Sequence, residues 1–297
     1  MPRRVGVVGL GIMGSAYARH LVEAGFSTSG FDVDAVAQRR FVEQDGFGAA
    51  DARAVAVGSD VVITALPSVA AVDAAFFGEH GLAAGAHDEL VVVEASTLPL
   101  AVKERVRSGM ASRGATVLDA PVSGTGSQAE RKDIAFYASG ERAAYDRAQD
   151  VLAAVARSVR YVGAFGTGSK LKYIANLLVT IHNVSTAEAV VLAQKAGIDP
   201  NAMIEIVGDG AGASRMLQVR GPMMAAGRYE PAAMKLDVYQ KDLDIIAAFA
   251  HEVGAPTPLF TQSAVFYEAA LAQGRGKQDT AAVASVLKTM AGLAPDS

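Results

Sequence analysis

The chain has 297 residues, of which 51% are hydrophobic and 20% are charged, and its formal net charge is −4 at pH 7. This length suffices for about two domains with sizeable cores, and the composition is that of a globular protein rather than a disordered one. The weak negative charge argues against a nucleic-acid partner. The absence of cysteine excludes disulfides and thiol nucleophiles, and it fits a reducing compartment such as the cytoplasm.

The first predicted element is an apolar strand at residues 5–8, which a glycine-rich turn connects to a helix at residues 15–24. The turn reads Gly9-Leu10-Gly11-Ile12-Met13-Gly14, the pattern G-x-G-x-x-G. Between a strand and a helix this pattern is typical of dinucleotide binding. Its first glycine permits the tight turn, its second admits a pyrophosphate, and its third lets helix pack on strand. We therefore predict that residues 9–14 bind a cofactor; the alternative is a turn without a ligand.

A second strand at residues 28–31 ends at Asp32, close to the distance of about 20 residues at which this motif places an acid on the ribose. A carboxylate there accepts hydrogen bonds from both ribose hydroxyls and repels a 2′-phosphate. We expect NAD to be preferred, with NADP possible. Asp34 is the rival position for this role.

Three further apolar strands, at residues 61–66, 90–94 and 116–118, have the continuous hydrophobic character of parallel strands covered on both faces. Small, hydroxyl-bearing or glycine residues follow each of them. Ligands of open parallel sheets bind beyond the carboxyl ends of the strands, so these turns indicate a site, although each alone could be a simple turn. The predicted cofactor contacts here are Leu66, Pro67 and Thr97.

The last strands are expected at residues 134–138 and 159–162, and helices follow at 171–195, 201–207, 235–252, 257–272 and 280–291. The predicted fold is an α/β Rossmann-type, doubly wound parallel sheet over residues 1–165, joined by a long helix to an all-α domain over residues 166–297. We find no continuous run of about 18 apolar residues and expect no membrane partner.

The long helix at 171–195 is apolar around most of its circumference, so we expect it to be buried on nearly all sides. Thr167 or Ser169 could cap its start. Lys172 and Asn176 are four residues apart and share one face of the helix. Burial and the positive end of the helix both disfavour an ammonium ion, which suits a general acid or base. The alternative is a lysine that extends into solvent.

Other proton donors and metal sites find little support. The five histidines are scattered singly and there is no cysteine, so no metal site is expected. None of the tyrosines starts a Tyr-x-x-x-Lys pair. These absences leave Lys172 as the best-placed proton donor.

Four motifs together resemble the β-hydroxyacid dehydrogenase family, typified by 3-hydroxyisobutyrate dehydrogenase. They are the turn at residues 9–14, Asp119-Ala120-Pro121-Val122-Ser123-Gly124, Gly166-x-Gly168-x-x-x-Lys172-x-x-x-Asn176 and Lys241-Asp242-Leu243. The resemblance implies hydride transfer between NAD(P) and a small β-hydroxyacid of the 3-hydroxyisobutyrate, sugar-acid or semialdehyde type. It also implies a homodimer or homotetramer.

The same resemblance implies roles for individual residues. Lys172 would be the catalytic acid/base and Asn176 would position the substrate. Ser123, Gly124, Thr97 and Lys241 would contact the substrate or the nicotinamide.

One departure from the family pattern is Thr125, which stands where the family has a second loop glycine and would also contact the substrate. Two alternative functions share this fold. An imine or ketone reductase would replace the lysine, and a non-catalytic nucleotide-binding module would lack an acid/base residue.

Overall fold

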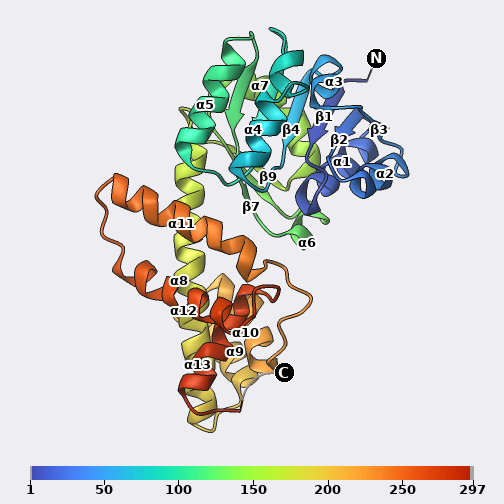
Figure 1. Cartoon of the computed structure of the whole chain (residues 1–297). Helices are drawn as coiled ribbons and strands as arrows, with labels where there is room; N and C mark the ends of the chain where they lie inside the picture. The colour runs from blue at the N-terminus through green and yellow to red at the C-terminus, as the bar shows by residue number, and fades with distance from the viewer. Residues whose placement is uncertain (1, 295–297) are drawn as a thin grey trace. The chain divides into compact units, whose positions relative to one another are not determined.

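The computed structural model describes residues 2–294 and divides the chain into two compact units, Met1–Lys172 and Tyr173–Ser297 (Figure 1). The division falls inside a long helix, α8 (Thr167–Lys195). The sequence places the domain boundary slightly earlier, between residues 165 and 166, and that position stays a prediction.

The first unit is built on a six-stranded sheet, and each pair of neighbouring strands is parallel. Its order, β3-β2-β1-β4-β5-β6, is that of the dinucleotide-binding fold, in which the chain reverses direction across the sheet between β1 and β4. The predicted doubly wound sheet is confirmed. The strands are β1 (Arg4–Val8), β2 (Ser27–Phe31), β3 (Phe47–Gly48), β4 (Val61–Thr64), β5 (Val91–Glu94) and β6 (Thr116–Asp119).

Helices cover both faces of this sheet, which explains the continuous apolar character of its strands. Along β4, Val61 and Ile63 belong to one core cluster, and Val62, which points to the other face, belongs to a second. The first cluster includes residues of α1 (Ile12–Glu23) and α7 (Arg142–Val155), and the second includes residues of α3 (Ala52–Val57), α4 (Val69–Phe77) and α5 (Leu100–Ala111). The remaining short helices are α2 (Ala35–Val42), η1 (Leu82–Gly85) and α6 (Gly126–Ala129).

The strands expected last in this unit form a separate small sheet rather than extending the large one. β7 (Val122–Ser123) runs antiparallel to β8 (Ala135–Ala138), and β8 runs parallel to β9 (Ser158–Tyr161). Asp119 at the end of β6 and Ser139 after β8 exchange backbone hydrogen bonds of 2.9 and 2.7 Å. The two sheets are therefore joined at the carboxyl end of β6.

The described residues of the second unit form helices and no strand. They are the rest of α8, then α9 (Pro200–Gly208), α10 (Arg215–Ala226), α11 (Leu236–Glu252), α12 (Pro258–Ala272), η2 (Thr280–Ala282) and α13 (Val283–Met290). Helix α10 has no counterpart in the sequence analysis, because Gly221 and Pro222 lie in its interior and normally interrupt a helix. Its start is nevertheless well capped, since Ser214 Oγ accepts from Leu217 N at 3.0 Å.

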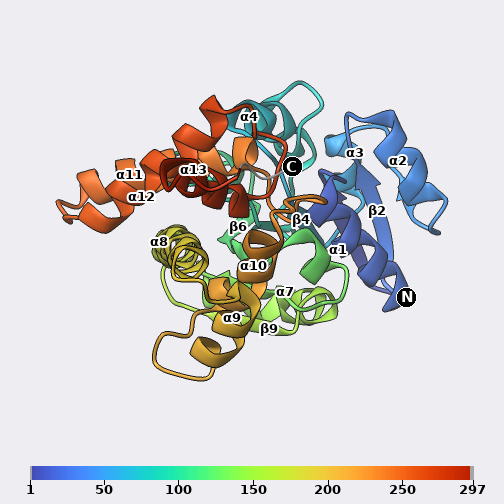
Figure 2. The same cartoon turned by 90° about the horizontal axis from the view of Figure 1, so that it is seen from below.

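Helix α8 is long and apolar enough to cross a membrane by length and composition. Tyr173, Val184 and Ala187 instead lie in the core cluster of the second unit, which is typical of a core helix. The expectation of burial on nearly all sides is wrong, because Ile174 is 53% exposed and Leu178 46% exposed. The other helices of the second unit therefore cover only part of the surface of α8, which Figure 2 shows nearly along the helix axis.

Candidate functional site

The glycine-rich turn between β1 and α1 has the geometry that a cofactor pyrophosphate requires. Gly9 has φ of +89°, and a Cβ there would lie 2.3 Å from the Ala65 carbonyl oxygen. A Cβ on Gly14 would lie 1.7 Å from the Gly9 carbonyl oxygen, whereas one on Gly11 would meet no atom within 4 Å. The outer glycines are therefore demanded by the turn itself. Gly11 leaves the space in which an anion can approach the start of α1.

The other residues of this turn divide by exposure. Leu10 and Met13 pack into or against the core, whereas Ile12 is 71% exposed. Leu10, at 3% exposure, therefore contributes to the packing of the turn rather than to its surface.

Asp32 follows β2 and holds the turn. Its Oδ2 accepts from Leu10 N at 2.6 Å, and its Oδ1 accepts from Asp34 N at 2.8 Å. The rival, Asp34, uses its own carboxylate to cap α2, accepting from Val36 N at 2.8 Å. The geometry therefore favours Asp32 as the acid beside the glycine-rich turn.

The turns after β4 and β5 are tied to each other. Leu66 N donates to Ser96 Oγ at 2.9 Å, and Ser96 N donates to Glu94 Oε1 at 3.0 Å. Pro67 and Thr97 are the next residues of these two turns. The predicted contacts Leu66, Pro67 and Thr97 thus lie together at the carboxyl edge of the sheet, where parallel sheets bind ligands.

The predicted substrate loop shows why its first glycine is retained and its second is replaced. Gly124 has φ of +140°, and a Cβ there would lie 2.6 Å from Ile134 Cγ2. Thr125 has φ of −101°, which any residue adopts. Thr125 N and Oγ1 donate to Gln128 Oε1 at 3.0 and 3.3 Å, so this hydroxyl already helps to start α6. The threonine thus stabilises the loop after Ser123 without requiring a different backbone.

The start of α8 is fixed by buried groups of the two sheets. Ser169 N donates to Asp119 Oδ2 at 2.8 Å, and Ser169 Oγ donates to Asp119 Oδ1 at 2.7 Å. Gly168 N donates to Ser139 Oγ at 3.0 Å. The expected cap by Thr167 or Ser169 is therefore replaced by acceptors from distant parts of the chain. A Cβ on Gly168 would lie 2.1 Å from the Tyr137 carbonyl oxygen, which explains that glycine.

A buried lysine completes this anchor. Lys103 on α5 is fully buried, and its Nζ lies 2.6 Å from Asp119 Oδ1 and 2.8 Å from Glu94 Oε2. Burial by itself lowers the pKa of the Lys103 ammonium, but Asp119 and Glu94 outweigh burial, so the pKa lies above its ordinary value. Lys103 therefore stays charged near neutral pH and is unsuited to proton transfer. The sequence analysis missed it.

Lys172 lies three residues beyond Ser169, on an unbroken stretch of α8. It is half-buried, whereas Lys170 is exposed. The anchored first turn of α8 therefore fixes the backbone position of Lys172.

Asn176 belongs to the second unit and is held by α11. Asn176 is 6% exposed, and its Nδ2 donates to Asp242 Oδ2 at 2.9 Å. Its backbone oxygen accepts from Thr180 Oγ1 at 2.8 Å and from Tyr239 Oη at 3.1 Å. Lys241 Nζ lies 3.4 Å from Asp242 Oδ1. The structure thus joins Asn176 to the Lys241-Asp242 segment, far away in sequence.

Family models match both halves of the chain. Residues 4–163 match the NAD binding domain of 6-phosphogluconate dehydrogenase, and residues 166–287 match the NAD-binding domain of NADP-dependent 3-hydroxyisobutyrate dehydrogenase. The chain is 34% identical over 287 residues to L-threonate dehydrogenase of Cupriavidus necator, covering 96% of each chain. The chain belongs to the β-hydroxyacid dehydrogenase family.

Other relatives agree with this assignment. The crystal structure of a 3-hydroxyisobutyrate dehydrogenase from Salmonella typhimurium has a TM-score of 0.86 and 32% identity, covering 96% of this chain and 99% of that one. The 3-sulfolactaldehyde reductase of Escherichia coli K12 is 29% identical, with 97% of each chain covered. This β-hydroxyacid dehydrogenase is thus an NAD(P)-dependent oxidoreductase of small hydroxyacids. An imine reductase from Myxococcus stipitatus, at 17% identity and a TM-score of 0.65, shares the fold alone.

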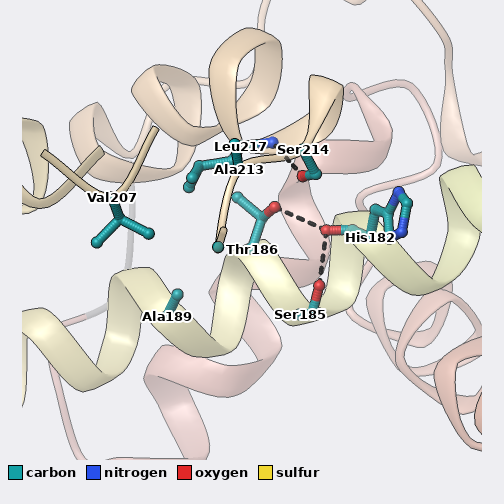
Figure 3. A pocket seen from close by; sticks show the side chains of 9 residues that line it. His182, Ser185, Thr186, Ala189, Val207, Ala213, Ser214 and Leu217 are labelled. Carbon is teal, nitrogen blue, oxygen red and sulfur yellow. Dashed lines mark hydrogen bonds between the residues drawn. The ribbon is translucent and has the colours of Figure 1, made fainter. Parts of the chain in front are cut away.

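The second unit of this β-hydroxyacid dehydrogenase contains a hollow of about 230 Å³ (Figure 3). Its lining residues include His182, Ser185 and Thr186 of α8 and Ser214, which leads into α10. Ser185 Oγ and Thr186 Oγ1 both donate to the His182 carbonyl oxygen, and Ser214 Oγ accepts from Leu217 N. These hydroxyls form hydrogen bonds with the backbone of α8 or cap the start of α10. None of the predicted site residues lines this hollow, and the described residues contain no group of acids and histidines that could hold a metal ion.

Proposed function

We propose that the chain is an NAD-preferring dehydrogenase of a small β-hydroxyacid of the sugar-acid type, with Lys172 as general acid/base. The observation that carries this proposal is the anchor at Asp119. Asp119 is the residue after which the loop with Ser123 and Gly124 begins. Its buried carboxylate also fixes the first turn of the helix that carries Lys172. A substrate loop and a proton-transfer residue are thereby built on a common support.

The chemistry follows from the residue types. When bound, NAD would supply the acceptor for the hydride that leaves the substrate carbon. In its neutral form the Lys172 amine takes the hydroxyl proton as the hydride leaves, and in the reverse direction its ammonium returns that proton. Backbone N–H groups around Gly124 suit the substrate carboxylate, since glycine permits close approach to an anion.

Asp32 supports the preference for NAD, because its carboxylate would repel a 2′-phosphate placed at the ribose. L-threonate, a four-carbon sugar acid, is the first substrate to test, since a relative at 34% identity is named for it. We further propose a cytoplasmic homodimer or homotetramer.

The test is a panel of L-threonate, 3-hydroxyisobutyrate, aldonic acids and a cyclic imine, each assayed with NAD or NADP and the imine with the reduced cofactors. We expect the highest kcat/KM with a sugar acid and NAD. Preferential turnover of the imine would support the reductase alternative. Cofactor binding without turnover of any hydroxyacid would support a non-catalytic nucleotide-binding module.

A further inference from the structure

The amide of Asn176 has a fixed polarity. Its Nδ2 lies 2.9 Å from Asp242 Oδ2, and the two residues are only 6% and 7% exposed. An ionised carboxylate accepts hydrogen bonds and donates none. Turning the amide around would place its carbonyl oxygen against the carboxylate and leave two buried acceptors facing each other. Asp242 thereby holds the NH₂ end of Asn176 on its own side and directs Oδ1 away from itself.

The surrounding contacts make this arrangement rigid. Tyr239, three residues before Asp242 on α11, donates to the Asn176 backbone oxygen, and Thr180 donates to the same atom. Lys241 Nζ lies 3.4 Å from Asp242 Oδ1, the carboxylate oxygen that does not accept from Asn176. Both the backbone and the side chain of Asn176 are therefore oriented by one helix.

We propose that Asp242 is a positioning residue that makes Asn176 a hydrogen-bond acceptor for a substrate hydroxyl. This inference rests on the proposed function. An acceptor suits a hydroxyl group and repels a carboxylate, so Asn176 meets the hydroxylated end of the substrate. The pairing thus fixes which end of the Asn176 amide is available to a substrate hydroxyl.

A double-mutant cycle tests this role with L-threonate, or with the panel member of highest kcat/KM. Asn176→Ala removes the acceptor, and Asp242→Ala removes the group that orients it. We expect each variant to lower kcat/KM for the hydroxyacid about tenfold or more, which is the scale of one lost hydrogen bond. The double variant should be no worse than Asn176→Ala alone, and the KM for NAD should stay unchanged in all of them.

Asp242→Asn provides a second arm that preserves side-chain volume. Its amide can accept from Asn176 Nδ2 or donate to Asn176 Oδ1, so the polarity is no longer fixed and an intermediate loss is expected. The cycle can be run with this variant if Asp242→Ala does not fold. Asp244→Ala is the matched control, since Asp244 is on the same helix and exposed, and its carboxylate bonds to Gln240. It should keep wild-type kcat/KM.

The outcomes separate the two proposals. Losses that multiply in the double variant would show that Asp242 acts independently of Asn176 and would overturn this inference. A drop in melting temperature with unchanged kcat/KM would overturn it too, because it would mean that Asp242 is only structural. A wild-type enzyme without hydroxyacid turnover would instead contradict the proposed function.

Discussion

Lys172 and Lys170 are two residues apart on α8, yet only one of them is expected to transfer a proton. Lys172→Ala should lower kcat at least about 10²-fold, the lower limit for loss of general acid/base catalysis. NAD should still bind, because the pyrophosphate contacts are assigned to residues 9–14. Lys172→Arg should fail almost as badly, since a guanidinium does not release its proton near neutral pH.

Lys170→Ala is the control for this prediction. Because Lys170 is exposed, its substitution should lower kcat only slightly. Steady-state kinetics measure kcat, and titration of NAD followed by fluorescence measures cofactor binding. A Lys172→Arg enzyme that keeps wild-type kcat from about pH 6 to 10 would show that the side chain acts only as a fixed charge.

Asp32 should set the choice of cofactor. The ratio of kcat/KM with NAD to that with NADP should exceed one in the wild type and fall at least about tenfold in Asp32→Ser, because the substitution removes a like-charge repulsion. Asp34→Ser is the control, since serine can replace aspartate as the cap of α2 and should leave the ratio unchanged. A wild type that prefers NADP would refute the assignment.

At the residue scale, the sequence predicted the positions that the local backbone restricts to glycine, such as Gly9 and Gly14, whereas the roles of the site residues stay predictions. It did not predict Lys103. In the sequence, this lysine lies among the other charges of an amphipathic helix and looks solvated, as most such lysines are. Only tertiary packing buries it against Asp119 and Glu94.

Among the elements, the start of α8 offers the clearest stability test. Ser169→Ala removes a hydrogen bond to a buried carboxylate and should lower the free energy of unfolding by about 1.5–3 kcal/mol. Ser185→Ala, on the same helix, removes an exposed hydroxyl that donates to the His182 carbonyl oxygen, and should change stability by less than about 0.5 kcal/mol. Urea denaturation, followed by circular dichroism, gives the free energy of unfolding of each variant. Equal stabilities of the two variants would contradict the role given to Asp119.

The predicted elements were most accurate where an apolar segment was continuous or long, as in the parallel strands, α8 and α11. Prediction failed where distant residues decide the outcome. Helix α10 continues through Pro222; Ser214 caps its start, and Lys288 of α13 donates to the Met224 carbonyl oxygen near its end. The separate sheet of β7, β8 and β9 depends on pairing between segments about a dozen or more residues apart, which no local pattern specifies.

For the whole molecule, we predict self-association through the exposed apolar face of α8. Leu171, Ile174 and Leu178 are 38%, 53% and 46% exposed, and their spacing of three and four residues places them on one side of the helix. Light scattering at micromolar concentration should give a multiple of 30.6 kDa. Replacing Ile174 and Leu178 together by glutamate should shift the mass toward the monomer. A single species near 30.6 kDa in the wild type would refute this prediction.

The double use of Asp119 has a consequence for how new specificities can arise in this scaffold. Positions in this loop that the backbone does not restrict, such as Thr125, can vary after the anchor if Gly124 is kept, while the bonds from Ser169 and Lys103 hold the start of the helix that carries Lys172. Loops from relatives with other substrates can therefore be grafted between Ala120 and Ala129. Such chimaeras should change which acid is oxidised and leave the proton-transfer step intact.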